Sequence, residues 1–217
     1  MPPKLRTLPR KIPRQERSRA TVEAILDAAA HVLVKDGFDG ASTNRIADAA
    51  GVSIGSLYQY FPSKEALIAG ISERNRADAV ASFAQVEQAP DFFDGLAQLA
   101  RHHLVDRGDS EVGLCAEIMS ESRRNADIAR LYQEIESDIK RRIAGLLETA
   151  RARGEIRADV DIEAAATVLM VLGDGMSWRR SVEKSFDAER VLPLILKMVH
   201  CLLAKPGACG ESGEERR

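Results

Sequence analysis

Side chains suited to nucleic-acid recognition are concentrated in residues 42–67, which read STNRIADAAGVSIGSLYQYFPSKEAL. The amide of Gln59 can pair with adenine in the major groove of DNA. Small residues such as Gly55 let the backbone approach base edges closely, and tyrosine hydroxyls and lysine amines suit phosphate contacts. The residues with this capacity are Thr43, Asn44, Arg45, Ser53, Gly55, Ser56, Tyr58, Gln59, Tyr60 and Lys64.

Two very short helices must present these side chains. The pattern predicts one helix over 43–50 capped by Ser42 and a second over 54–60 capped by Ser53, because serine hydroxyls satisfy the first free amides of a helix. Gly51 between them permits a sharp turn. The face of the second helix that we expect to be exposed carries Ser53, Gly55, Ser56, Gln59 and Tyr60.

A longer helix upstream supplies the cover that such short helices need. Its apolar residues recur at helical spacing and stop at Gly37, where a left-handed residue would end the helix. One long and two short helices describe a helix-turn-helix over residues 42–61, whose second helix enters the DNA major groove. The alternative is a three-helix knot inside an all-α bundle, with Tyr58 and Tyr60 at the edge of the core. The apolar stripe comprises Val22, Ile25, Leu26, Ala29 and Leu33.

This stretch resembles the DNA-binding domain of the tetracycline-repressor (TetR/AcrR) family over about residues 19–79. The pattern IAxxAGVSxGxLYxYFxSKEAL carries the resemblance, after an amphipathic helix that ends in glycine. The resemblance implies a homodimeric transcriptional regulator, most often a repressor, that binds a near-palindromic operator and is released by a small effector. It implies operator contacts by Thr43, Asn44, Gly55, Ser56, Tyr58, Tyr60 and Lys64, and a core position for Phe61.

The chain as a whole is predicted to be all-α, with about nine helices, because helical periodicity recurs throughout and no segment alternates like a strand. We expect a basic disordered arm over 1–18, the DNA-binding domain over 19–79, a ligand-binding and dimerisation domain over 80–205, and a disordered tail over 206–217. Residues 1–19 hold seven Lys and Arg and one Glu, a balance of +6 in a chain of net charge −2. Such an arm suits a polyanion, although a solvated tail explains it as well.

The last two predicted helices favour dimerisation. Between 191 and 203 only Pro193, Lys197 and His200 are not apolar, and a helix that is apolar all round must be covered on every side. One side can face the core of its own chain and the other a second copy. The alternative is a single deeply buried helix. The predicted interface residues are Val168, Leu172, Met176, Leu192, Ile195, Val199 and Leu202.

An effector pocket in the C-terminal domain is implied by the family resemblance. Aromatic residues make up only 5% of the chain, which favours an aliphatic lining and a lipophilic effector. The alternative for each candidate is an ordinary place in the core or at its edge. The candidates are Phe92, His103, Cys115, Met119, Met170, Asp174 and Trp178.

Other classes of protein find less support. The chain has no HExxH, no ExxH pair and no GxxxxGK[ST], so neither an enzyme nor a metal-binding bundle is favoured, and we expect no cofactor and no metal. A DNA-binding protein without any effector remains a third possibility. The N-terminus lacks the apolar run of a signal peptide and no stretch could span a bilayer, so we expect a cytoplasmic protein without a membrane partner.

Overall fold

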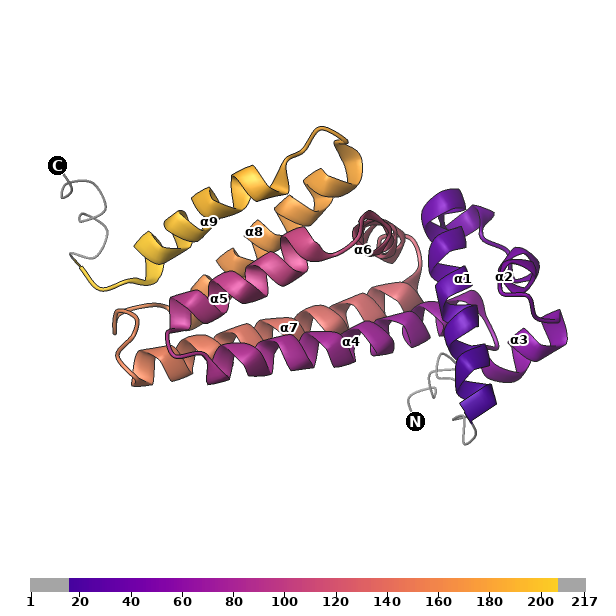
Figure 1. The fold of residues 1–217 in the computed structure, drawn as a ribbon, viewed down its shortest axis with the longest axis horizontal. Helices are drawn as coiled ribbons and strands as arrows, with labels where there is room; N and C mark the ends of the chain where they lie inside the picture. Colours follow the sequence, from indigo (N-terminus) through magenta and orange to yellow (C-terminus); the bar gives the residue numbers. More distant parts are fainter. Residues whose placement is uncertain (1–15, 207–217) are drawn as a thin grey trace. The chain divides into compact units, whose positions relative to one another are not determined.

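The computed structural model describes residues 16–206 and confirms the all-α prediction: this range holds nine α-helices and no strand (Figure 1). One short π-helix, η1, follows α5 directly. The helices are α1 (Glu16–Gly40), α2 (Thr43–Ala49), α3 (Ile54–Tyr60), α4 (Lys64–Gln88), α5 (Phe92–Arg101), η1 (His102–Asp106), α6 (Asp109–Ser122), α7 (Ala126–Ala152), α8 (Ile162–Val182) and α9 (Ala188–Leu203).

Local rules explain most of these boundaries. Gly37, Gly51 and Gly154 adopt φ values of 70°, 67° and 69°, a left-handed region that favours glycine, and each interrupts or follows a helix. The side chain of Asp161 accepts the amide of Ala164 and so caps α8. Gly37 and Gly51 are the points at which the sequence predicts the first two helices to end.

The described part of the chain forms two compact units. The first combines the described residues of Met1–Asp78 with Gly108–Ile135, and therefore contains α1–α3, α6 and the adjoining parts of α4 and α7. Helix α1 packs against both α2 and α6. In its core, Leu26 of α1 lies with Leu57 of α3 and Leu114 of α6. Residues of α6 thus belong to the same compact unit as α2 and α3.

The second unit contains the remaining parts of α4 and α7 with α5, η1, α8 and α9. Its main core brings Phe92 of α5 together with Leu147 of α7, Ala166 of α8 and Leu203 of α9. A smaller cluster lies where η1 packs against α8 and α9, around Met176 and Leu192.

Two local features interrupt the regular α-helices of the second unit. The segment 102–106, which follows α5 directly, is a π-helix. Pro193 lies inside α9, five residues after its first residue. Most of the predicted arm and most of the predicted tail lie outside the described residues, but residues 16–18, part of the predicted disordered arm, form the start of α1. Across 16–206, no helix is both long and apolar enough to cross a membrane.

Candidate nucleic-acid interface and effector region

The two short helices are held in place by matching serine caps. The Ser42 hydroxyl accepts the backbone amide of Arg45 at 3.3 Å, and the Ser53 hydroxyl accepts that of Ser56 at 3.1 Å. Gly51 makes the turn between them. These caps satisfy amides that would otherwise lack partners at each helix start. The predicted helix-turn-helix geometry therefore rests on short-range hydrogen bonds that the sequence itself specifies.

Residues Gly51–Gly55 also match the GxSxG pattern of serine hydrolases. In those enzymes the serine lies on a turn between a strand and a helix. Here Ser53 lies between two helices, and its hydroxyl oxygen serves as the N-cap of α3. The local structure is therefore that of a helix-turn-helix and does not provide a nucleophile elbow.

The inner face of the motif is fully buried. Ile46 and Ala47 of α2 and Leu57 of α3 pack with the α1 stripe, as the sequence predicts. Phe61, directly after α3, is also in this core. Burial of these residues orients α3 so that the opposite side of the helix faces outward.

The outward side of α3 is small and mostly uncharged. Its exposed residues are Ile54, Gly55, Tyr58 and Gln59. The Tyr58 ring is 44% exposed, and its hydroxyl lies 3.0 Å from the Thr43 hydroxyl, which links the start of α2 to α3. Ser56 is half-buried, whereas Ser53 and Asn44 are exposed. These residues form one polar surface that could meet a groove and its flanking phosphates.

Tyr60 does not lie on this surface, so its predicted exposed position is wrong. Its ring is only 9% exposed, and its hydroxyl lies 2.8 Å from that of Ser18 in α1. Position 60 follows Leu57 by three residues, which places both side chains on the same, inward face of α3. Tyr60 therefore ties α3 to α1.

Arg45 and Lys64 are also tied to α1. The Arg45 guanidinium lies 2.9 Å from the Asp36 carboxylate and donates to the carbonyl of Gly40 at 3.3 Å. The Lys64 amine donates to the carbonyl of Phe38 at 2.6 Å and lies 4.2 Å from the centre of its ring. Both cations hold the chain just beyond the kink at Gly37. Nothing in the sequence spacing predicted these tethers, because they depend on how α1 bends.

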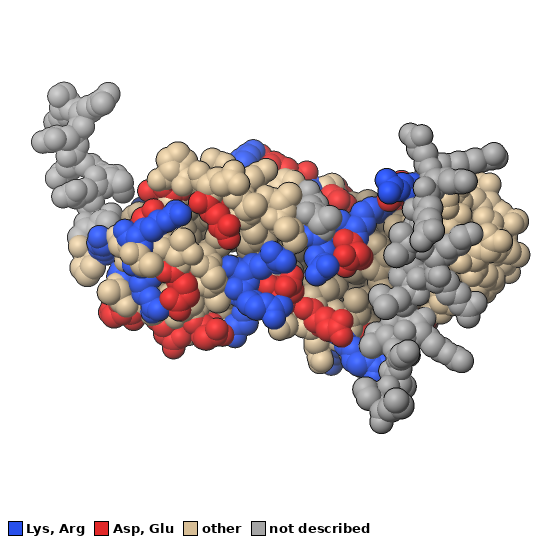
Figure 2. Space-filling model, turned by 90° about the horizontal axis from the view of Figure 1, so that it is seen from below, with Lys and Arg blue, Asp and Glu red and all other residues tan. Residues whose placement is uncertain are grey.

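Charges on the long helices do not single out a polyanion site. Figure 2 shows Lys and Arg beside Asp and Glu on the face that carries α4 and α7. On α7 the Asp138 carboxylate pairs with Arg142 at 3.0 Å and with Arg141 at 2.9 Å. Hydrogen bonds from Arg142 and then Arg141 lower the pKa of Asp138. Such mixed pairs are typical of a solvated helix surface.

The outer faces of α8 and α9 expose a set of large apolar side chains. This finding corrects three predicted interface residues: Met176, Leu192 and Val199 are buried in their own chain. Leu172 and Ile195 are half-buried, while Val168 and Leu202 are exposed as expected. On α8 the exposed apolar residues are spaced by three, seven and four positions, which places them along one side of the helix. The exposed apolar set is Val168, Val171, Trp178, Val182, Leu194, Met198 and Leu202.

The predicted effector residues are not brought together into one pocket. Trp178, 44% exposed, and Asp174 lie on the outer side of α8, so their predicted place inside a pocket is wrong. Partial burial raises the pKa of Asp174. Among the others, Phe92 is buried and stacks edge-on against Phe93, whereas His103 and Met170 are half-buried. Cys115 and Met119 lie on α6, in the other compact unit.

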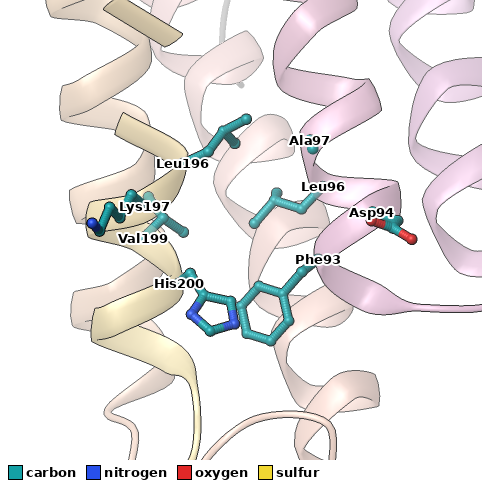
Figure 3. Close-up of a pocket in the computed structure, with 8 residues that line it drawn as sticks. All are labelled: Phe93, Asp94, Leu96, Ala97, Leu196, Lys197, Val199 and His200. Carbon is teal, nitrogen blue, oxygen red and sulfur yellow. The ribbon is translucent and has the colours of Figure 1, made fainter. Parts of the chain in front are cut away.

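A cleft lies between α5 and α9 in the second unit (Figure 3). Its empty volume, including the open mouth, is about 510 Å³. Leu96 and Leu196 point toward each other across it, and the rings of Phe93 and His200, with centres 4.4 Å apart, close one end. The charged ends of Asp94 and Lys197 point away from the cleft. Its inner surface is therefore mainly apolar.

Within residues 16–206 no group of three His, Cys, Asp or Glu side chains could hold a metal ion. The main surface features of this part of the chain are the outward face of the short helix α3, the exposed apolar side chains of α8 and α9, and the apolar cleft between α5 and α9.

The chain belongs to the tetR family of bacterial regulatory proteins. The model for that family matches residues 25–71, which include α2 and α3, and the model described as "BetI-type transcriptional repressor, C-terminal" matches residues 93–204. Members are transcriptional regulators and not enzymes, as the sequence predicts.

Individual relatives agree with this assignment. The chain is 29% identical over 162 residues to the HTH-type transcriptional regulator UidR of Escherichia coli (strain K12), covering 75% of this chain and 82% of UidR. The structure of Salmonella enterica GusR superimposes with a TM-score of 0.74 at 31% identity, covering 84% of this chain and 95% of GusR. FadR from Bacillus subtilis, solved in complex with stearoyl-CoA, shares the fold at 20% identity, with a TM-score of 0.72 over 82% of this chain and 96% of FadR.

Proposed function

We propose that this regulator is a repressor that binds a near-palindromic operator as a homodimer and releases it when a small lipophilic effector binds. The observation that carries the proposal is the outward face of α3, which is narrow, uncharged and backed by a fully buried Leu57. A helix of this kind can enter the major groove without desolvating charges of its own.

In this proposal each exposed residue of α3 makes a particular kind of contact with DNA. Gln59 reads a base edge through its amide, Ile54 contacts a thymine methyl, and Gly55 lets the backbone come close. Tyr58 and Asn44 contact phosphates on either side of the groove. The hydroxyls of Thr43, Ser53 and Ser56 lie next to this surface and can donate to phosphate or base oxygens. Arg45, Tyr60 and Lys64 act from behind, by holding α2, α3 and α4 against α1.

Dimerisation through the outer faces of α8 and α9 explains their exposed apolar residues. A monomer rarely exposes a large apolar patch without a function for it. The exposed stripe of α8 also contains Gly175, where an added Cβ would meet nothing within 4 Å, so a partner helix can approach closely. A twofold dimer presents two recognition helices to two half-sites, spaced by one turn of DNA or a multiple of it.

A lipophilic effector suits the apolar cleft between α5 and α9. Its lining offers carbon atoms and one histidine ring, and no charged group points into it. The fold alone does not select the ligand: a neighbour at 21% identity, from Saccharomonospora viridis, was solved with choline, whereas FadR of Bacillus subtilis was solved with stearoyl-CoA. The side chains of the cleft are therefore the basis for our choice. We place this activity in the cytoplasm, where the operator lies.

A footprinting and gel-shift experiment with DNA from the protein's own promoter region tests operator binding. We expect protection of two half-sites related by a dyad, and mass measurements should give a dimer. Absence of any footprint at moderate salt would overturn the proposal.

Deletion of residues 1–16, which lie almost entirely outside the described residues, tests the arm. It should flatten the dependence of log affinity on log salt, because basic groups that neutralise phosphates release counterions.

The effector is tested separately by thermal shift with medium- and long-chain fatty alcohols. Ala97→Trp, which fills the cleft, should abolish any stabilisation that wild type shows. Stabilisation that survives in Ala97→Trp would place the effector elsewhere, and no stabilisation by any lipophilic compound would favour a regulator without such an effector.

A further inference from the structure

The π-helix η1 lies where the chain passes from one compact unit to the other. It continues α5 without a break and ends at Asp106; Arg107 is the last residue of this segment in the second unit, and Gly108 opens the first unit again as the N-cap of α6. Short π-helices are rare in proteins, and those that do occur are often found at functional sites. Their last carbonyls lack partners within the helix, so something else must satisfy them.

Arg180 of α8 satisfies two carbonyls at this end. Its guanidinium donates through Nη1 to the carbonyl of Leu104 at 2.9 Å and through Nη2 to that of Arg107 at 2.8 Å. The planar fork of arginine can make both bonds at once, and its positive charge suits the C-terminal end of a helix. The contact spans more than 70 residues of sequence, so it fixes the junction to α8 independently of the chain on either side.

The same turn of α8 belongs to the outer apolar face. Trp178 and Val182, each two residues from Arg180, are both exposed. Helix η1 also packs against α9, whose other sides carry the cleft and the remaining exposed apolar residues. A shift of α8 or α9 on effector binding would therefore reach the carbonyls held by Arg180.

On the far side of the junction, α6 lies directly against α1. An added Cβ at Gly113 of α6 would lie 3.2 Å from the Val34 side chain of α1, so the two helices are in close contact there. Helix α1 in turn holds α3 through Ser18 and Tyr60. The start of α6 is therefore connected to α3 through two contacts, one between α6 and α1 and one between α1 and α3.

We propose that Arg180 is the positioning residue that couples the C-terminal helices to the DNA-binding helices, by clamping the Arg107–Gly108 junction to α8. It touches neither DNA nor effector. This inference rests on the proposed function as a dimeric operator-binding protein. When the Arg180 hydrogen bonds are present, the dimer holds its two recognition helices at a defined spacing. When they are absent, each DNA-binding domain can adjust to its own half-site.

The matched pair Arg180→Met and Arg179→Met tests the clamp. Arg179 is its neighbour on α8 but makes only a surface ion pair with Glu183, at 3.6 Å. Each protein is titrated with the natural operator, with operators whose centre is lengthened by one or two base pairs, and with a single half-site. We expect wild type and Arg179→Met to lose about tenfold or more in affinity when the spacing changes. Arg180→Met should discriminate by less than about threefold, with half-site affinity unchanged.

Hydrogen exchange of the free proteins gives a second readout. Amides of residues 104–112 should exchange faster in Arg180→Met than in wild type or Arg179→Met, because the junction has lost its anchor. If Arg180→Met does not fold, Arg180→Lys keeps the charge but cannot hold both carbonyls in one fork, and it should show partial loss of spacing discrimination.

Two results would overturn the clamp: unchanged exchange over 104–112, or wild-type spacing discrimination in a folded Arg180→Met. Failure of wild type to bind any duplex would overturn the proposed function instead, and the exchange comparison would still decide whether Arg180 anchors the junction.

Discussion

A substitution at Gly55 should affect protein stability and operator binding in opposite directions. It is the second residue of α3 and is exposed, and an added Cβ there would meet only the Ser53 hydroxyl, at 4.0 Å. Glycine within a helix costs roughly 0.5–1 kcal/mol relative to alanine. No contact within the described structure requires a glycine at this position. Gly55→Ala should therefore stabilise the isolated protein by up to about 1 kcal/mol, which corresponds to about 2–4 °C in Tm for a chain of this size.

Operator binding should respond in the opposite direction. In the proposed complex the new methyl group of Gly55→Ala lies between the backbone of α3 and the base edges, and it forces the helix outward. Loss of one well-placed base contact costs about 1–3 kcal/mol, so a dimer with two DNA-binding domains should lose about 2–6 kcal/mol of binding free energy. Thermal melts and fluorescence-anisotropy titrations on the same preparations measure both effects.

Gly145 provides the matched control for this substitution. It lies in α7, is exposed, and an added Cβ would meet nothing within 4 Å. Gly145→Ala should raise Tm by a similar amount and leave operator affinity unchanged. If Gly55→Ala is stabilised like the control and also binds operator with wild-type affinity, α3 does not approach DNA closely and the assignment of its outward face is refuted.

Three further contrasts follow from burial. Tyr58→Ala should weaken operator binding by about 1–3 kcal/mol with little change in Tm, whereas Tyr60→Ala should lower the free energy of unfolding by about 3 kcal/mol or more; melts and titrations separate them. Asp174→Asn should raise Tm at neutral pH, because burial raises the pKa of this carboxyl and its ionised form disfavours folding; the gain should vanish below the usual Asp range, as melts against pH would show. Val171→Asp should raise the dimer dissociation constant by about 100-fold or more, since an unpaired charge would be buried twice. Met176→Ala should instead lower the free energy of unfolding by about 2–5 kcal/mol, which sedimentation and melts would distinguish.

Sequence rules predicted the features of this fold that depend on near neighbours. The Ser42 and Ser53 caps, the turn at Gly51 and the kink at Gly37 all follow from preferences of single residues for particular backbone conformations. Burial of Leu57 follows from helical periodicity. The helix-turn-helix could therefore be predicted almost to the residue.

Features set by tertiary contacts could not be predicted in this way. Residues of α9 are apolar on all sides, so periodicity could not tell that Leu192 faces inward and Leu194 outward. Carbonyls at the end of the π-helix accept hydrogen bonds from the distant guanidinium of Arg180, which no local pattern reveals. The residue type of Tyr60 predicts a phosphate contact on the outward face, but its hydroxyl lies 2.8 Å from that of Ser18 in another helix.

The tethers to α1 have a consequence for how an effector can act. Tyr60, Arg45 and Lys64 join α3, α2 and α4 to one helix, and the core between them is closed. Deforming α3 would break the contact between Tyr60 and Ser18 and open the closed core around Leu57. In the proposed dimer, an effector that leaves this core intact would therefore have to release the operator by moving whole DNA-binding domains relative to each other. A dimer bound to two half-sites is sensitive to such a movement, since a misplacement of a fraction of a helical turn removes the base contacts of one domain while leaving its structure unchanged.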